Sequence, residues 1–103
     1  MSYKYTVTYT KTEESPANAF NTIPLLTVDS LTNVTQEQLN LLQNTYPVQW
    51  ERFDVENQLI FNYTYNSEAD YNARQNSPII QDFLARRTAW AELNKITVTL
   101  RVL

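Results

Sequence analysis

The stretch of residues 48–77 constrains the fold more than any other part of the chain. Two segments rich in aromatic and β-branched residues, 48–53 and 59–65, are joined by the short polar segment 55–58, a pattern that predicts a β-hairpin. Directly after the second segment, Ser67 is a suitable N-cap for a helix. The stretch therefore predicts strand, turn, strand and helix start, and the other elements have to pack around this hairpin.

The second strand of this hairpin has an aromatic side and a more polar side. Apolar and aromatic residues alternate with the others, so one side carries Leu59, Phe61, Tyr63 and Tyr65 and the other carries Ile60, Asn62 and Thr64. In the first strand, Val48 and Trp50 suit the aromatic side. Phe53 falls out of that alternation, and a β-bulge or a strand end near Arg52 would reconcile it.

Residues 3–10 and 96–102 alternate in the same way and predict two further strands. Tyrosine or aliphatic side chains occupy one side of each strand, and threonines dominate the other. Residues 11–33 are less informative: Ser15-Pro16 can start a short helix over 17–22, whereas residues 24–33 fit either a loop or an additional extended segment.

Capping signals predict the helices. Thr35 and Gln38 form a capping box for a helix from Gln36 to about Thr45, and Pro47 follows its end. A short helix should follow Ser67 and end near residue 75. Ser77-Pro78 then begins a longer helix to about Leu93, and helical spacing places one set of residues on its buried face: Ile80, Phe83, Leu84, Arg87, Trp90 and Ala91.

The resulting order, β-α-β-β-α-β, predicts one α+β domain over residues 1–103 with the ferredoxin-like fold. We expect a four-stranded, mainly antiparallel sheet with helices on one face and the first and third strands at its centre. Each crossover contains a helix, as a connection between parallel neighbours requires. The alternatives are another α+β sandwich, or a fold in which residues 24–29 add a strand to the sheet.

The absence of histidine, cysteine and glycine excludes several kinds of site. Haem with a proximal histidine, histidine-ligated metals, Ser-His-Asp triads and cysteine nucleophiles are all excluded. Without glycine there is no P-loop and no dinucleotide-binding fingerprint. We therefore expect no metal and no cofactor, and we expect turns with positive φ to use asparagine or aspartate.

The charge distribution disfavours a nucleic-acid partner. The formal net charge is −3, and Arg86-Arg87 is the only adjacent basic pair of note. No apolar run approaches the length of a membrane span, and the N-terminal residues lack the apolar region of a signal peptide. We expect a cytoplasmic protein without membrane contact.

The predicted sheet has a second face that the helices do not cover. Its residues are Thr6, Thr8, Thr10, Ile60, Asn62, Thr64, Thr97, Thr99 and Arg101. Such a face can stay in contact with water, or it can pack against a second copy across a two-fold axis. The residues alone favour neither alternative.

The segment from Phe61 to Phe83 resembles the dimeric α+β-barrel proteins of the antibiotic-biosynthesis-monooxygenase-like branch. The resemblance lies in the strand-end aromatic Tyr65, the Ser67-capped short helix and the Ser77-Pro78 restart. It implies the ferredoxin-like fold and a homodimer whose sheets form a barrel. Arg74 and Ile79 stand where the family often has histidines, and Tyr65 stands where it has tryptophan, so the haem-degrading, chlorite-dismutating and histidine-dependent relatives are poor models.

The aromatic residues are the candidates for a ligand site. Trp50, Phe61, Tyr63, Tyr65, Tyr71 and Trp90 can either line a pocket for a flat apolar or phenolic ligand between sheet and helices or simply form the core. Asn62, Arg74 and Arg87 can supply hydrogen-bond partners. Arg87 can hold a carboxylate ligand, or it can reach solvent or pair with a glutamate.

Three functions follow from these patterns. The first is a small homodimeric protein that binds an aromatic or apolar ligand between sheet and helices. The second, which rests on the family resemblance, is a cofactor-independent monooxygenase-like enzyme whose aromatic substrate activates oxygen itself, with Trp50, Asn62, Tyr63, Tyr65 and Arg74 positioning that substrate. The third is an interaction module that offers a free sheet edge around residues 48–53 to an extended peptide.

Overall fold

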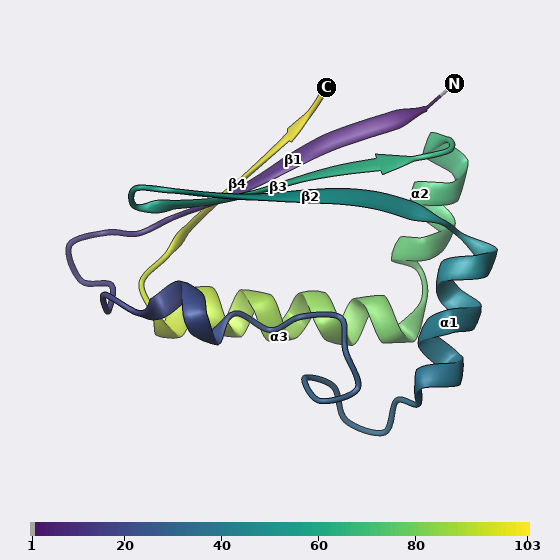
Figure 1. Cartoon of the computed structure of the whole chain (residues 1–103), viewed down its shortest axis with the longest axis horizontal. Coiled ribbons are helices and arrows are strands. Elements are labelled where there is room, and N and C mark those ends of the chain that lie inside the picture. The colour runs from purple at the N-terminus through teal and green to yellow at the C-terminus, as the bar shows by residue number, and fades with distance from the viewer. Residues whose placement is uncertain (1) are drawn as a thin grey trace.

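The computed structural model describes residues 2–103, which form four strands, three α-helices and one 3₁₀ turn (Figure 1). In chain order they are β1 (Tyr3–Thr10), η1 (Ala19–Thr22), α1 (Gln36–Thr45), β2 (Val48–Val55), β3 (Gln58–Tyr65), α2 (Glu68–Gln75), α3 (Pro78–Leu93) and β4 (Thr97–Val102). The predicted α+β fold with the ferredoxin-like order of elements is confirmed.

All strand pairs in the sheet are antiparallel, and the strand order is β2-β3-β1-β4. The central positions of β1 and β3 are as predicted. The expectation that each helical crossover joins parallel neighbours is wrong. β1 and β2 do run in the same direction, but β3 lies between them, and β1 likewise separates β3 from β4. Each crossover therefore passes over one strand.

The helices lie on one side of the sheet (Figure 1). α3 runs beneath the strands, whereas α1 and α2 stand at the end where β2 begins and β3 ends. The side chains that face α3 form the main core, among them Tyr5, Val7, Tyr9, Leu59 and Phe61. We call this side of the sheet the helix-facing side and the opposite side the outer face.

Strand β2 is regular along its whole length. Its pairing with β3 continues without a bulge from Val48 opposite Tyr65 to Val55 opposite Gln58. Phe53 simply points to the outer face, where it pairs with Ile60, so the expected bulge or strand end near Arg52 is absent. The sequence pattern was misleading because an apolar residue on the outer face looks like an interruption in the alternation of apolar and polar residues along the strand.

The predicted caps are mostly confirmed. The Thr35 side chain accepts a hydrogen bond from the Gln38 amide, and the Gln38 side chain accepts one from the Thr35 amide. The Ser67 hydroxyl accepts from the Asp70 amide at 3.1 Å. At α3, Ser77 occupies the N-cap position without a side-chain hydrogen bond, and Pro78 begins the helix.

The buried face of α3 differs from the prediction at one position. Leu84 is 41% exposed, while Ile80, Phe83, Arg87, Trp90 and Ala91 are buried as expected. Helical spacing places Leu84 at the margin of the apolar stripe, which is consistent with its exposure.

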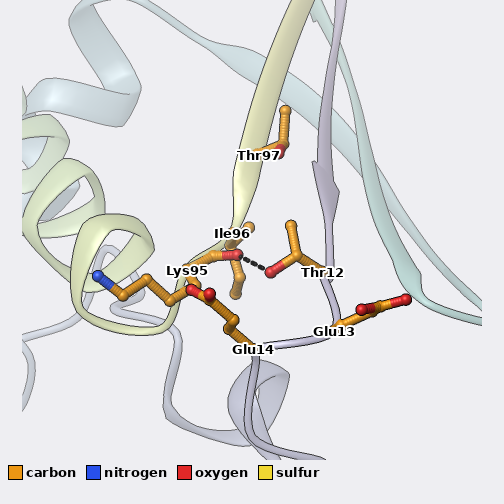
Figure 2. Close-up of a pocket in the computed structure, with 6 residues that line it drawn as sticks. All are labelled: Thr12, Glu13, Glu14, Lys95, Ile96 and Thr97. Atoms are coloured by element: carbon orange, nitrogen blue, oxygen red, sulfur yellow. Dashed lines mark hydrogen bonds between the residues drawn. The ribbon is translucent and has the colours of Figure 1, made fainter.

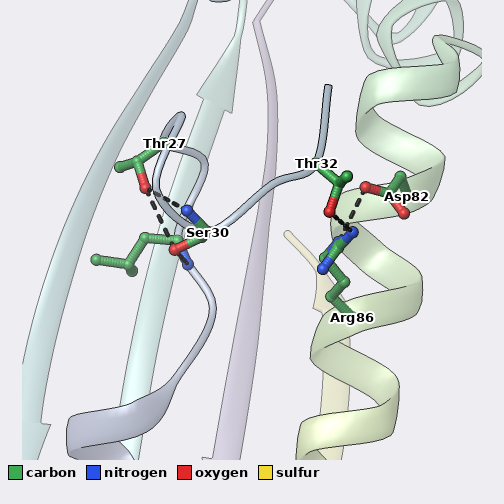
Figure 3. A network of polar contacts seen from close by, with 6 residues as sticks. Thr27, Ser30, Thr32, Asp82 and Arg86 are labelled. Carbon is green, nitrogen blue, oxygen red and sulfur yellow. Dashed lines mark hydrogen bonds and ion pairs between the residues drawn. The ribbon is translucent and has the colours of Figure 1, made fainter. Parts of the chain in front are cut away.

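Residues 11–33 form loops and turns around the single turn η1, and residues 24–29 add no strand to the sheet. The part from Pro24 to Val34 follows α3 and is held by side-chain contacts (Figure 3). Arg86 of α3 donates to the Thr32 hydroxyl at 2.8 Å while pairing with Asp82. Leu31 packs with residues of α1 and α3. This segment was hard to predict because contacts from α3, rather than local periodicity, determine its path.

Among residues 2–103, three residues have positive φ: Asn33, Asn57 and Lys95. Two of them are asparagines, as the lack of glycine predicts, and Asn57 lies in the turn between β2 and β3. Lys95 follows α3 and is the exception. No helix in the described part of the chain, residues 2–103, is long and apolar enough to cross a membrane.

Candidate functional site

Trp50 is the most exposed aromatic side chain on the helix-facing side. It lies directly opposite Tyr63 in the sheet, and its ring centroid is 6.0 Å from that of Phe61. Even so, 57% of Trp50 is exposed, because the helices cover the centre of the sheet and leave most of β2 uncovered. The expectation that Trp50 lines an enclosed pocket is therefore wrong: its indole is exposed at the edge of the core.

Arg87 lies beneath this region and is only 6% exposed. Its Nε donates to the Pro24 carbonyl at 2.9 Å. Its Nη1 lies 3.2 Å from the hydroxyl oxygens of both Tyr9 and Tyr63 and donates to them. The guanidinium also lies 4.7 Å from the ring centroid of Phe61 and 4.5 Å from that of Phe83 on α3. Cation–π attraction to these rings therefore offsets part of the free-energy cost of burying the charge.

In the described part of the chain, no carboxylate pairs with Arg87. Within residues 2–103, the ion pairs are Arg52 with Asp54 and Arg86 with Asp82. The sequence allowed Arg87 either to reach solvent or to pair with a glutamate. Within residues 2–103 no glutamate pairs with it, and only 6% of the residue is exposed. A buried charge normally has a partner of opposite charge, so Arg87 is an unusual charged residue.

Arg74 is also buried, at 5% exposure, but a helix end compensates its charge. Its Nη1 donates to the Tyr46 carbonyl at 2.9 Å and to the Gln43 side chain at 3.3 Å, both at the C-terminus of α1. Free carbonyls at a helix C-terminus favour a cation. Burial lowers the pKa of Arg74, while nearby tyrosines such as Tyr65 oppose that effect.

A group of stacked tyrosines occupies the core next to Arg74. Tyr5 lies between Tyr63 and Tyr65, with ring centroids at 5.0 and 6.0 Å, and Tyr71 of α2 packs edge-on against Tyr5 and Tyr65. Burial raises the pKa of Tyr5 strongly and the neighbouring Tyr65 raises it further. Tyr65 is therefore a core residue at the α2 end, packed by other aromatic rings.

Burial also raises the pKa of Tyr63, although the positive charge of Arg87 acts in the opposite direction. At neutral pH its hydroxyl is protonated, since even an unperturbed tyrosine titrates near pH 10. Tyr63 therefore remains a hydrogen-bond donor beside the guanidinium.

The remaining two candidates, Trp90 and Asn62, make their polar contacts with other residues. Trp90 is buried, and its indole nitrogen donates to the Ala19 carbonyl at 3.2 Å and the Thr22 hydroxyl at 3.1 Å, which attaches η1 to α3. Asn62 points to the outer face, where its side-chain oxygen accepts from the Thr6 hydroxyl at 2.8 Å.

The structure thus brings together Trp50, Tyr63 and Arg87, which we call the Arg87 site. It separates them from Asn62, which is on the other side of the sheet. The sequence reasoning missed Tyr9, whose hydroxyl contacts Arg87. The alternation of Tyr9 with Tyr5 and Val7 placed it on the correct side of the sheet. No pattern in the neighbouring sequence indicated which residue of α3 its hydroxyl would contact.

Two pockets lie elsewhere on the surface, at places that the sequence did not suggest. One, of about 500 Å³, is lined by residues 12–14 and 95–97, next to the end of β1 and the start of β4 (Figure 2). There the Thr12 hydroxyl donates to the Lys95 carbonyl at 2.7 Å. The other, of about 430 Å³, lies between α1 and α2 beside Leu42 and Ala73.

Comparison with known proteins supports the fold. Neither a family model nor a curated protein matches the sequence. The solved structure of Rv0793 from Mycobacterium tuberculosis is similar, with a TM-score of 0.54 over 100% of this chain and 93% of that chain. The two sequences are 13% identical, so the similarity concerns the fold alone. The chain therefore shares an overall fold with that protein, and its function has to be argued from its own residues.

Proposed function

We propose that the protein is a homodimer that binds a flat aromatic small molecule at the Arg87 site. The observation that carries this proposal is the exposed indole of Trp50 on the helix-facing side of β2. When an exposed aromatic side chain stacks on a ligand ring, apolar area is buried and favourable ring contacts form. Tyr63, partly exposed beside it, adds a second ring and a hydroxyl group.

Binding is favoured over oxygenase chemistry by the positions of the side chains. The oxygenase hypothesis requires Trp50, Asn62, Tyr63, Tyr65 and Arg74 around one substrate. Asn62 points to the outer face, and Tyr65 and Arg74 pack at the α2 end of the core. Only Trp50 and Tyr63 of that set belong to the Arg87 site.

The proposed dimer rests on the outer face of the sheet. No helix within residues 2–103 covers it (Figure 1). Besides the threonine rows it carries partly exposed apolar residues that the sequence pattern had not assigned there, Phe53 and Val55. A second copy packed on this face would leave the Arg87 site open, because the site lies on the opposite side of the sheet.

Calorimetric titration with 1-naphthamide and 1-naphthoate tests the binding function. We expect at least one of these probes to bind and Trp50→Ala to weaken that binding by about tenfold, since the main stacking surface is lost. Phe53→Ala is the matched control, because it removes an exposed aromatic ring from the same strand on the other face. Equal effects of the two substitutions, or no binding of either probe, would refute the proposal.

A further inference from the structure

Arg87 has more hydrogen-bond donors than the described residues 2–103 use. A guanidinium has five N–H groups, one on Nε and two on each Nη atom. The Pro24 carbonyl takes the Nε donor, and the two tyrosine hydroxyls take those of Nη1. The two donors of Nη2 have no acceptor among these residues.

Nη2 lies at the accessible surface. Every buried side-chain nitrogen or oxygen in the described part of the molecule has a hydrogen-bond partner. Because Nη2 has no partner there, it cannot be one of the fully buried atoms, although Arg87 as a whole is 6% exposed. One edge of a buried guanidinium thus keeps some contact with the surface.

Tyr63 supplies a second free donor at the same place. Its oxygen accepts from Arg87 Nη1 at 3.2 Å, so the proton of the hydroxyl remains available. No acceptor for that proton is found within residues 2–103. Tyr63 also lies directly opposite Trp50 in the sheet, and the Cβ atoms of such a pair are about 5 Å apart. A ligand ring stacked on Trp50 can therefore present a polar substituent to both donors.

The charge balance selects the kind of substituent. Arg74 has the C-terminus of α1 to offset its charge, whereas Arg87 has only a loop carbonyl, two neutral hydroxyls and aromatic rings. Adding an anion to a desolvated, unpaired arginine is favourable, and hydrogen bonds between charged groups are about twice as strong as neutral ones. A neutral substituent would leave the charge unpaired.

We propose that the ligand is an aromatic carboxylate, whose carboxylate oxygens accept hydrogen bonds from Arg87 Nη2 and the Tyr63 hydroxyl while its ring stacks on Trp50. This inference rests on the proposed binding function and specifies the chemical class of the ligand. It assigns Arg87 the role of charge partner and Tyr63 the role of second donor.

The experiment compares 1-naphthoate with 1-naphthamide, which have the same ring and differ in charge, by calorimetric titration at pH 7 in low salt. We expect the carboxylate to bind at least tenfold more tightly than the amide. Arg87→Met should abolish this preference. Arg86→Met is the matched control, because the neighbouring arginine on the same helix pairs with Asp82 and contacts Thr32 instead (Figure 3).

Tyr63→Phe keeps the ring and removes only the hydroxyl, so it provides the test if Arg87→Met does not fold. We expect it to weaken 1-naphthoate binding about tenfold and 1-naphthamide binding by less than about threefold, as for a neutral hydrogen bond. Equal affinity of the two probes for the unmodified protein would overturn the carboxylate inference and leave aromatic binding in place. Failure of both probes would overturn the binding function, and the inference with it.

Discussion

The tyrosine hydroxyls between sheet and helices are kept protonated by burial, and this has a measurable effect at alkaline pH. Tyr5 and Tyr63 both have raised pKa values in the folded chain, whereas unfolded tyrosine titrates near pH 10. Below pH 10 both states hold the protons, so the contribution of these residues to stability is fully present. Above pH 10 only the folded chain retains them, so the free energy of unfolding should decrease as pH rises.

Urea unfolding between pH 8 and pH 11, combined with tyrosinate absorbance, measures this effect. The loss should reach about 1.4 kcal/mol per pH unit for each tyrosine that stays protonated only when folded. Tyr5→Phe removes one such group and should make the decrease shallower. Identical slopes for the two proteins would contradict the assigned cause.

Individual residues show what the sequence can and cannot predict about the site. Helical spacing placed Arg87 on the buried face of α3, and alternation placed Trp50 and Tyr63 on the helix-facing side. These patterns could not predict how exposed each side chain is. Trp50 is exposed and Arg87 is buried because of the position that α3 takes under the sheet. Leu84 shows the same limit, since spacing alone assigned it to the core.

At the scale of elements, the C-terminus of α3 forms a Schellman motif without glycine. The Ile96 amide donates to the Ala91 carbonyl at 2.8 Å, and the Lys95 amide donates to the Glu92 carbonyl at 3.3 Å. This motif places Lys95 at φ 58°, in the left-handed region where glycine is the usual residue. A side chain with a Cβ atom is strained there.

Lys95→Gly should therefore raise the free energy of unfolding by about 1 kcal/mol. Asn57→Gly is the matched control, because Asn57 has φ 64° but asparagine tolerates this conformation. Urea unfolding of the two variants should show a clear gain for the first and little change for the second. A loss of stability in Lys95→Gly would show that its side chain contributes more than its backbone strain costs.

The elements also differ in how well the sequence predicted them. Thr35 and Ser67 mark their helices through hydrogen bonds that span only three residues, so a local pattern was sufficient. The segment that follows η1 has no comparable signal. Arg86 and Arg87 hold it through Thr32 and the Pro24 carbonyl, contacts between residues far apart in the sequence.

At the scale of the whole molecule, the uncovered outer face predicts the oligomeric state. Thr8 lies near the middle of this face, with Ile60 on one side and Thr99 on the other. If the proposed dimer forms there, light scattering should give twice the chain mass of 12.1 kDa. Thr8→Glu should shift the mass to that of one chain, because two carboxylates would be buried at the interface without partners.

Ala85→Glu adds the same charge to the exposed side of α3 and should leave the dimer intact. Circular dichroism has to show that both variants are folded. A monomeric unmodified protein, or a Thr8→Glu variant that remains dimeric, would exclude this face as the interface.

The central position of β1 also determines how quickly the chain can fold. Thr10 pairs with Gln58 on one side and Thr97 on the other. Among the strand pairs of the described residues, only β2 with β3 is local in sequence. Long loops must close before β1 gains its contacts, and chains with such non-local pairings fold more slowly than chains built from local contacts. We therefore expect the β2–β3 hairpin to form early and β1 to join it in the rate-limiting step, so that core substitutions in β1 slow folding as well as lower stability.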